Sequence, residues 1–251
     1  MPGAPVLTPA IVLRTLRYGE TSRVVRLATA DQGVLSAIAK GALRPRSRFG
    51  GTLQLLSEGQ AHLHLSRSSD LHLLVAFDLV SPHTTLGADL ERFAAATALA
   101  ELAARFVPSA PNPELYTVLR DDLALIEAVP REGVVVVSLR ALWRLMTQLG
   151  IGPTLESCAR DGAPLPPGGA SLSLRDGGFL CSGCARGAMA TRLTARDRED
   201  LVALVTEGAP VPILDEKQER AHRRLLLRWV REHLAETSLP AMEAWASARA
   251  A

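Results

Sequence analysis

The chain has 251 residues, of which 47% are hydrophobic and 22% are charged, and its formal net charge is +2. This composition is typical of a folded globular protein with one large domain or two modest ones, and it excludes an intrinsically disordered chain. No run approaches the roughly 18 apolar residues of a transmembrane helix, and the N-terminus lacks the charged-then-apolar pattern of a secretion signal, so we expect a cytoplasmic protein.

Positive charge is concentrated near the N-terminus. Between residues 14 and 48 the chain carries eight basic residues against only Glu20 and Asp31. Such a concentration favours a polyanionic partner such as nucleic acid. The eight basic residues are Arg14, Arg17, Arg23, Arg26, Lys40, Arg44, Arg46 and Arg48.

The first 80 residues show the alternation and the turn signals of short β-strands. Turn residues at 19–20 and 31–33 separate the first three strands, and leucines alternate strictly with histidines between 62 and 65. Five short strands in a segment of this length suit a small β-barrel, most commonly of the OB type. We therefore predict an OB-fold nucleic-acid-binding domain over residues 1–81, with strands near 10–18, 22–30, 33–41, 60–66 and 70–80.

After residue 82 the apolar period becomes that of amphipathic helices. Apolar residues lie at i, i+3, i+4 and i+7 within 99–106, and a second helix is predicted over 135–149, although its valine run alone would favour a strand. Residues 155–190 are rich in glycine and proline, and helices resume beyond them. We predict an α+β protein with several domains, in which residues 82–154 and 191–251 form a helical domain and residues 155–190 are an insertion.

The sequence GALRPRSRFGG, residues 41–51, places Arg44, Arg46 and Arg48 at alternate positions. If the segment is extended, the three guanidinium groups point the same way and can each bind phosphate oxygens with two hydrogen bonds. The alternative is a solvated loop with unrelated charges. Tyr18 and Phe49 are the only aromatic residues of this basic region that could stack on bases, so affinity should depend on phosphates and fall steeply with salt.

The last long helix carries a second group of basic residues. At helical spacing the five lie within a sector roughly 80° wide, with apolar residues on the opposite side. This basic stripe predicts a second nucleic-acid surface or a docking face for an acidic partner, and the alternative is an ordinary solvated face softened by Glu216 and Glu219. The stripe consists of Lys217, Arg220, Arg224, Arg228 and Arg231.

All three cysteines lie in the glycine- and proline-rich insertion. Cys158 precedes Asp161 in a C-x2-D pair, and Cys181 and Cys184 form a C-x2-C pair after nineteen intervening residues. With cysteine at position 161 this spacing would be that of a zinc ribbon. Three interpretations remain: Asp161 is the fourth ligand of a Cys3Asp site, water fills the fourth position, or the insertion holds no metal. A bound zinc would be structural, because no general base is evident nearby.

The sequence contains no motif that assigns an enzymatic reaction. Phosphate-binding loops of the Walker and dinucleotide types and the nucleophile elbow are absent. His62 and His64 lie on one face of a predicted strand, where histidines usually form a solvent-exposed face. We therefore expect a protein that is not an enzyme and has no catalytic residues.

Several segments resemble the RecO family of DNA repair and recombination mediators. Tyr18, Glu20 and Ser22 match its Tyr-x-Glu-x-Ser element, and the strand ending at 39–41 together with the Ser-Arg-Phe at 47–49 matches the segment that follows. The insertion is similar to the family's cysteine segment, with Asp161 where the family has cysteine. The sequence LLLRWVREHL, residues 225–234, resembles its final helix.

The resemblance implies an OB fold, a helical domain with an inserted zinc ribbon, and no bond-making chemistry. RecO-like proteins bind single- and double-stranded DNA and anneal complementary strands. They contact single-stranded-DNA-binding protein and RecR, and help RecA load onto coated DNA, which implies a nucleoid-associated location. Carried over by position, Lys40, Arg44, Arg46 and Arg48 would contact DNA, and Cys158, Cys181 and Cys184 would hold Zn²⁺.

Three other functions remain as alternatives. A zinc-ribbon protein of transcription or RNA metabolism would prefer RNA or a particular sequence. A metal-dependent enzyme would lose activity with chelator and regain it with metal. A protein-interaction scaffold would bind its partner tightly and would not bind DNA at low salt.

Overall fold

The computed structural model describes residues 5–234 and 238–248. The chain forms two compact units, Met1–Val129 and Pro130–Ala251, called here the N-terminal and the C-terminal unit. None of the helices in the described ranges combines the length and apolar character that crossing a membrane requires. The divisions at residues 81/82, 154/155 and 190/191 remain predictions about domains.

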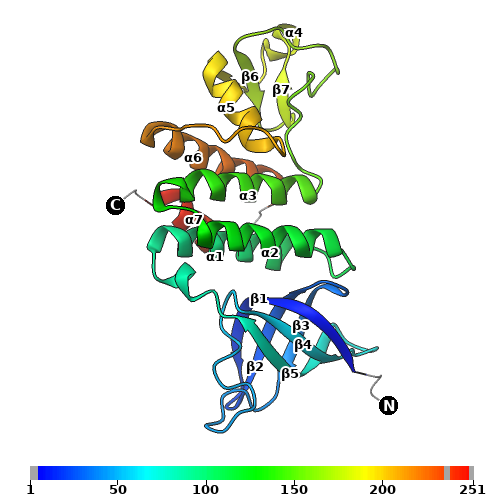
Figure 1. The fold of residues 1–251 in the computed structure, drawn as a ribbon. Helices are drawn as coiled ribbons and strands as arrows, with labels where there is room; N and C mark the ends of the chain where they lie inside the picture. Colours follow the sequence, from blue (N-terminus) through cyan, green and yellow to red (C-terminus); the bar gives the residue numbers. More distant parts are fainter. Residues whose placement is uncertain (1–4, 235–237, 249–251) are drawn as a thin grey trace. The chain divides into compact units, whose positions relative to one another are not determined.

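The N-terminal unit contains the predicted five-stranded closed barrel (Figure 1). Its strands are hydrogen-bonded in the order β1-β2-β3-β5-β4, and only the β3–β5 pair is parallel. The alternation of small and branched apolar residues in these segments matches the two-residue period of a strand with one buried face. The strands are β1 (Val6–Tyr18), β2 (Ser22–Thr29), β3 (Gly33–Ala39), β4 (Glu58–His64) and β5 (Leu71–Ser81).

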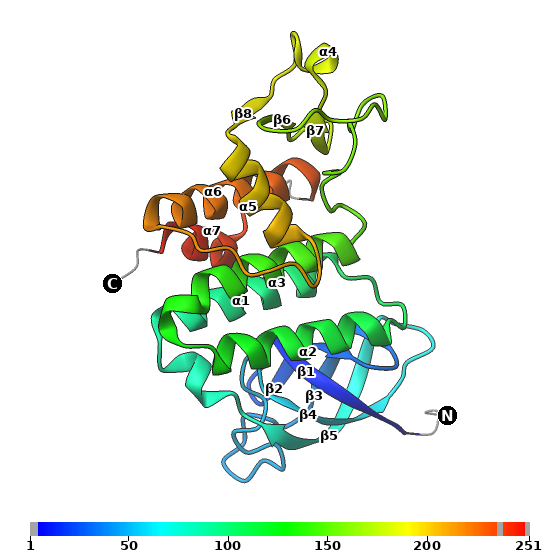
Figure 2. The ribbon, with the colours of Figure 1, turned by 45° about the horizontal axis from the view of Figure 1, so that its top comes forward.

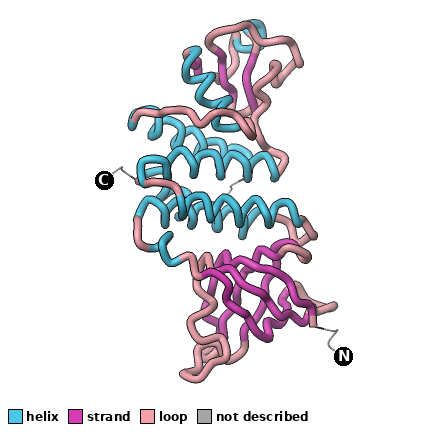
Figure 3. The backbone as a smooth tube through the Cα atoms, in the orientation of Figure 1, coloured by secondary structure: helices cyan, strands magenta, loops and turns pink. Residues whose placement is uncertain are grey.

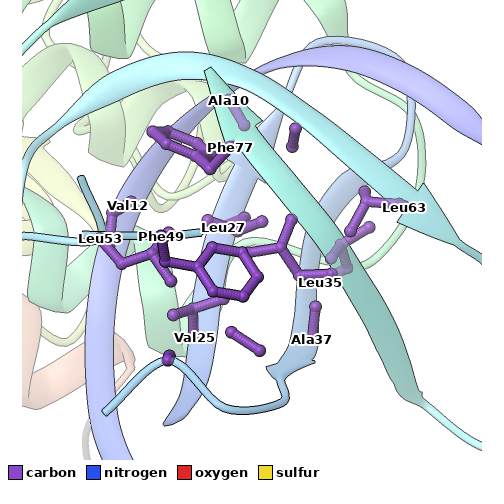
Figure 4. Packing of buried hydrophobic residues seen from close by; sticks show 14 residues of the cluster. Ala10, Val12, Val25, Leu27, Leu35, Ala37, Phe49, Leu53, Leu63 and Phe77 are labelled. Atoms are coloured by element: carbon purple, nitrogen blue, oxygen red, sulfur yellow. The ribbon is translucent and has the colours of Figure 1, made fainter. Parts of the chain in front are cut away.

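The barrel interior is filled by side chains from every strand and from the segment between β3 and β4 (Figure 4). Val25 and Leu27 of β2 and Leu35 of β3 point inward, and Phe49 inserts its ring among them. This packing gives the connecting segment an apolar anchor, because removing a phenylalanine ring from water is strongly favourable.

The barrel is followed in the same unit by a short 3-10 helix, η1 (Thr84–Gly87), and by α1 (Leu90–Phe106) and α2 (Pro113–Ala128). Asp89 caps α1 by accepting hydrogen bonds from two backbone N–H groups of its first turn. α1 packs against β1 and β2, and Arg26 of β2 donates to the carbonyl of Ala104 at 3.2 Å. Helix α2 was not predicted from the sequence, because a proline such as Pro113 commonly ends a helix, whereas here it is the first residue of one.

The C-terminal unit consists of helices and a small three-stranded sheet (Figure 2). The valine run that could have been a strand is the start of α3, because its apolar residues continue a buried helical face. Trp143, Trp229 and Trp245 fill the core, and the indole of Trp229 donates to the carbonyl of Ile151 at 2.8 Å. The helices are η2 (Arg131–Gly133), α3 (Val134–Gln148), α5 (Ala195–Val205), α6 (Glu216–His233) and α7 (Pro240–Ser247).

The small sheet, with a one-turn helix beside it, forms the ribbon that carries the cysteines. Loops make up much of this region (Figure 3). The strands are hydrogen-bonded in the order β7-β6-β8. Because β8 ends at Leu193, the sheet extends three residues past residue 190, the predicted end of the insertion. Its elements are β6 (Ala170–Ser173), β7 (Gly178–Leu180), α4 (Ser182–Ala185) and β8 (Thr191–Leu193).

Candidate nucleic-acid interface and candidate metal centre

The arginine-rich stretch is a series of tight turns between β3 and β4, which we call the turn segment (residues 41–52). Backbone N–H groups of Arg44, Ser47 and Gly50 donate to the carbonyls three residues before them, at 3.1, 3.0 and 3.1 Å. Gly41 and Gly50 have positive φ angles of 72° and 49°, which these turns require. The extended conformation considered from the sequence is therefore wrong, since local hydrogen bonds curl the segment.

The charged groups of the turn segment nevertheless face solvent. Arg44, Arg46 and Arg48 are all exposed, as is Lys40 at the start of the segment. No ion pair joins any of these four to an acidic residue within the part of the chain that the structure describes. The three arginines of the segment and the preceding Lys40 thus present four positive charges that no acidic residue of the described chain compensates.

Phe49 was predicted as a surface for base stacking, and the structure contradicts this. Its side chain is only 1% exposed and lies within the barrel core (Figure 4). The guanidinium of Arg48 lies 5.4 Å from the centre of its ring. Phe49 therefore holds the turn segment onto the barrel, because its ring is inaccessible to a base. Tyr18, which is 57% exposed, is the remaining stacking candidate.

The arginines of β1 and β2 stand in two cross-strand pairs, Arg14 opposite Arg26 and Arg17 opposite Arg23. Like charges placed directly opposite each other destabilise a sheet unless another group compensates them. The two arginines of β2 are compensated by hydrogen bonds to other parts of the protein. Arg23 donates to the carbonyl of Leu53 at 3.1 Å, and Arg26 donates to the carbonyl of Ala104 and to the hydroxyl of Ser36. Burial also lowers the pKa of Arg26.

The β1 arginines have no such acceptors. Arg14 and Arg17 are exposed, and no hydrogen bond of their side chains is recorded among the described residues. The turn segment begins beside the β1–β2 turn, since the N–H of Leu43 donates to the carbonyl of Thr21 at 2.8 Å. We use the name barrel surface for the exposed basic residues of β1 and of the region from Lys40 to Arg48, which are Arg14, Arg17, Lys40, Arg44, Arg46 and Arg48.

The basic stripe lies on α6, with all five cations exposed. Two of them are neutralised: Arg220 pairs with Glu216 at 3.1 Å and Arg231 pairs with Glu243 at 2.8 Å. Lys217, Arg224 and Arg228 form no ion pair within the described residues. The stripe is therefore smaller as an electrostatic feature than the sequence predicted. Sequence reasoning also missed the buried Arg223, which donates to the carbonyl of Trp245 at 2.6 Å.

The four residues that the sequence proposed as metal ligands converge in the ribbon. One ligand atom from each of Cys158, Asp161, Cys181 and Cys184 lies within 4.8 Å of all the others. Four ligands arranged tetrahedrally at the usual zinc–sulfur distance are separated by about 3.7 Å, so the cluster fits a small tetrahedral ion. Cys158 is buried, and the other three are partly or fully exposed.

The carboxylate of Asp161 lies among the three thiols of the cluster. The thiols of Cys184 and Cys181 both point at its Oδ2, at 3.1 and 3.6 Å. Hydrogen bonds, first of all from Cys158, hold the pKa of Asp161 well below its usual range. The hydrogen bond to Asp161 raises the pKa of Cys184 to about 12, so a metal would have to displace that proton.

Backbone N–H groups position one ligand atom in the C-x2-D pair and one in the C-x2-C pair. The N–H of Ala163 donates to Asp161 Oδ1 at 3.0 Å, and the N–H of Cys184 donates to Cys181 Sγ at 3.4 Å. Arg160 donates to the carbonyl of Cys184 and pairs with Asp176. These contacts help to hold the four potential metal-ligating atoms close together.

The predicted histidine pair lies outside this cluster. His62 pairs with Asp78 at 2.6 Å on the outer face of β4 and β5. Among the residues that the structure describes, His62 and His64 belong to no group of potential metal ligands. The expectation that they form a solvent-facing strand agrees with this placement.

Comparisons with known proteins find matches along nearly the whole chain. The family model described as "Recombination protein O N terminal" matches residues 4–83, and "Recombination protein O C terminal" matches residues 87–243. The chain is similar to the "DNA repair protein RecO" of Anaeromyxobacter dehalogenans (strain 2CP-C), with 38% identity over 179 residues, 70% of this chain and 69% of that protein.

Proteins of the same description from other bacteria are also similar. The protein of Synechococcus elongatus is 37% identical over 152 residues, which is 60% of this chain and 56% of that protein. The protein of Desulfitobacterium hafniense (strain DSM 10664 / DCB-2) is 35% identical over 176 residues, 70% of this chain and 63% of that protein.

Proposed function

Because the chain belongs to the RecO family of DNA repair proteins, we propose that it is a non-catalytic mediator of recombinational repair in the cytoplasm, at the nucleoid. It binds single- and double-stranded DNA, anneals complementary strands, and with RecR helps RecA load onto DNA coated by single-stranded-DNA-binding protein. The observation that carries the DNA-binding part is the barrel surface, a set of exposed cations without acidic partners among the described residues. Three of these cations, Arg44, Arg46 and Arg48, lie on the segment that the buried ring of Phe49 anchors.

The barrel surface is suited to phosphate rather than to base recognition. Guanidinium groups bind phosphate oxygens through two parallel hydrogen bonds, and each phosphate neutralised releases condensed counterions. The turns and the buried Phe49 fix the backbone from which Arg44, Arg46 and Arg48 project. Less conformational entropy is then lost on binding than from a free loop.

The small number of exposed aromatic residues fits strand annealing. Two strands repel each other as polyanions, so a protein that neutralises phosphates lowers the main obstacle to pairing. Bases stacked on protein rings are not free to pair. With Phe49 buried, Tyr18 is the one aromatic candidate on the barrel surface, so bound strands keep most of their bases available.

The ribbon supports the proposal of a structural Zn²⁺. The ligands would be the three thiolates and the Asp161 carboxylate, and thiolate sulfur and carboxylate oxygen are both zinc ligands. Bound there, the ion would cross-link the C-x2-D pair to the C-x2-C pair and stabilise the ribbon's fold. The chain's own residues position it: Ala163 orients the carboxylate, and the N–H of Cys184 orients the sulfur of Cys181.

The three unpaired cations of the basic stripe support a second contact with DNA or with an acidic segment of a partner such as single-stranded-DNA-binding protein. Lys217, Arg224 and Arg228 line a hollow of about 620 Å³ whose other lining residues include Leu193 and Leu225. The lining also includes Asp197 and Asp215, so the complementarity to an acidic segment rests on the three unpaired cations.

The proposed function is tested by fluorescence anisotropy of a labelled single-stranded oligonucleotide across a salt series. The triple variant Arg44→Glu, Arg46→Glu, Arg48→Glu should bind far more weakly. The slope of log affinity against log salt should lose about two units, because three phosphate contacts are removed. The matched control, Arg44→Lys, Arg46→Lys, Arg48→Lys, keeps the charges and should keep most of the slope. Equal binding by the native protein and the glutamate variant would refute the role of the turn segment.

A further inference from the structure

The ribbon contains a cleft that none of the functions above uses. It has a volume of about 490 Å³ and lies between β6, β8, α4 and the loop over 165–169, which we call the ribbon cleft. Its three charged lining residues, Arg186, Arg192 and Arg198, are all cationic, and none of its lining residues is acidic. A concave site lined by charges of one sign focuses the electric field and attracts the opposite charge.

Arg198 is built into the wall of the cleft. Its Nη1 donates to the carbonyls of Pro166 and Gly168 at 2.6 and 3.2 Å, and its guanidinium lies 5.5 Å from the centre of the buried Phe179 ring. The wall is closely packed, because a Cβ at Gly169 would lie 2.6 Å from the carbonyl oxygen of Leu193. Arg198 therefore supplies a fixed positive charge and holds the loop that shapes the cleft.

Arg186 and Arg192 have free donors. Both are exposed, and neither forms a side-chain hydrogen bond or an ion pair among the described residues. Arg192 lies on β8 directly opposite Ser171 of β6, and Arg186 follows the last residue of α4. The end of α4 and strand β8 thus place the two arginines, which are six residues apart in the sequence, in the lining of one cleft.

We propose that the ribbon cleft binds the phosphodiester backbone of a nucleic-acid strand, with Arg186 and Arg192 contacting phosphate oxygens. The apolar floor, which includes Leu165 and Leu180, would lie against a sugar or base. Guanidinium forks match phosphate geometry, and the hydroxyls of Ser171 and Ser182 add donors to the lining. This inference rests on the proposed DNA-binding function and adds a contact on the C-terminal unit to the one on the barrel.

The test uses the full-length protein and a labelled single-stranded oligonucleotide in a salt series. Arg186→Ala and Arg192→Ala should each weaken binding by up to about fivefold and reduce the salt slope by about 0.7, since each removes one phosphate contact. The double variant should lose about 1.4 units of slope. The control is Arg175→Ala, which removes the same charge from an exposed position of the ribbon outside the cleft and should leave the slope unchanged. Circular dichroism checks the fold.

Two results would refute the proposal that the ribbon cleft binds a nucleic-acid strand. One is an unchanged slope in both cleft variants. The other is an equal loss in Arg175→Ala, which would mean that only net charge matters. A poly-glutamate peptide in the same titration identifies the rival occupant: if Arg186→Ala weakens peptide binding and leaves DNA binding unchanged, the cleft takes acidic peptides and the proposal is wrong.

The failure of this inference is distinguishable from failure of the proposed function. If the glutamate variant of the turn segment loses DNA binding while the cleft variants keep the native slope, the barrel contact stands and the cleft contact falls. If the native protein binds no DNA even at low salt, both fall.

Discussion

Substitutions at Phe49 and Tyr18 test whether each ring stabilises the barrel core or stacks on a DNA base. Phe49→Ala removes a side chain that is 1% exposed and lies among the apolar residues of the barrel core. Deleting a buried phenylalanine to alanine costs about 3–5 kcal/mol, and Phe49→Leu, which keeps most of the apolar volume, should cost about 1–2 kcal/mol. The comparison is Tyr18→Leu, whose ring is 57% exposed and whose loss should change stability by less than about 0.5 kcal/mol.

The choice of assay follows from where the chromophores lie. All three tryptophans belong to the C-terminal unit, so tryptophan fluorescence does not report on the barrel. Hydrogen exchange of peptides from β2 and β3, read by mass spectrometry, measures opening of the barrel itself. Protection there should fall in Phe49→Ala and, less, in Phe49→Leu, and should stay native in Tyr18→Leu.

DNA affinity should show the opposite order. Under conditions where the barrel is folded, Phe49→Leu should change the affinity for single-stranded DNA less than twofold, because its ring touches no base. Tyr18→Leu should weaken binding by about 5- to 150-fold if one base stacks on this ring. The reasoning is refuted if Phe49→Leu weakens binding as much as Tyr18→Leu while β2 and β3 keep their protection.

Two further predictions concern pH and metal. Burial raises the pKa of Glu127, but its hydrogen bond and ion pair with His83, at 2.6 Å, outweigh burial and hold it below the usual range. Its stabilising contribution is therefore complete above the ordinary glutamate pKa and is lost as pH falls through the lower folded value. The Tm difference between native protein and Glu127→Gln should shrink below about pH 4, and a pH-independent difference would contradict this. Asp161→Cys should bind Zn²⁺ more tightly than the native protein, and Asp161→Ala more weakly, in competition with a chromophoric chelator; equal affinities would show that Asp161 is not a ligand.

Local patterns predicted most of the regular elements, with α2 as an exception, and the four residues that cluster in the ribbon. Short apolar runs bounded by turn residues predicted the five strands, and one of the runs, at 60–66, alternates strictly as the two-residue period of a strand requires. The capping box of Asp215 and Gln218 and the apolar spacing after it define α6. The C-x2-D and C-x2-C turns each present both of their ligand atoms on one side. The two turns lie together because the N–H of Ala159 donates to the carbonyl of Phe179, at 2.7 Å.

Tertiary structure decided which side chains of the basic region are buried or hydrogen-bonded and which are exposed. Phe49 lies in an exposed-looking basic stretch, and only the closed barrel supplies the cavity that buries it. Arg23 and Arg26 look like Arg14 and Arg17 in sequence, yet carbonyls of distant segments, Leu53 and Ala104, accept their hydrogen bonds. The partners of a charged side chain depend on which chain segments the fold brings beside it.

The ribbon cleft is another feature that could not be predicted from the sequence. Arg186 and Arg192 share no sequence period, and they line one cleft only because β8 pairs with β6 beside α4. The sequence by itself determined the strands of the barrel, the helices other than α2 and the candidate metal ligands, since those depend on short-range spacing. Which cations remain available to bind phosphate was decided by packing, because long-range contacts use up some donors and leave others exposed.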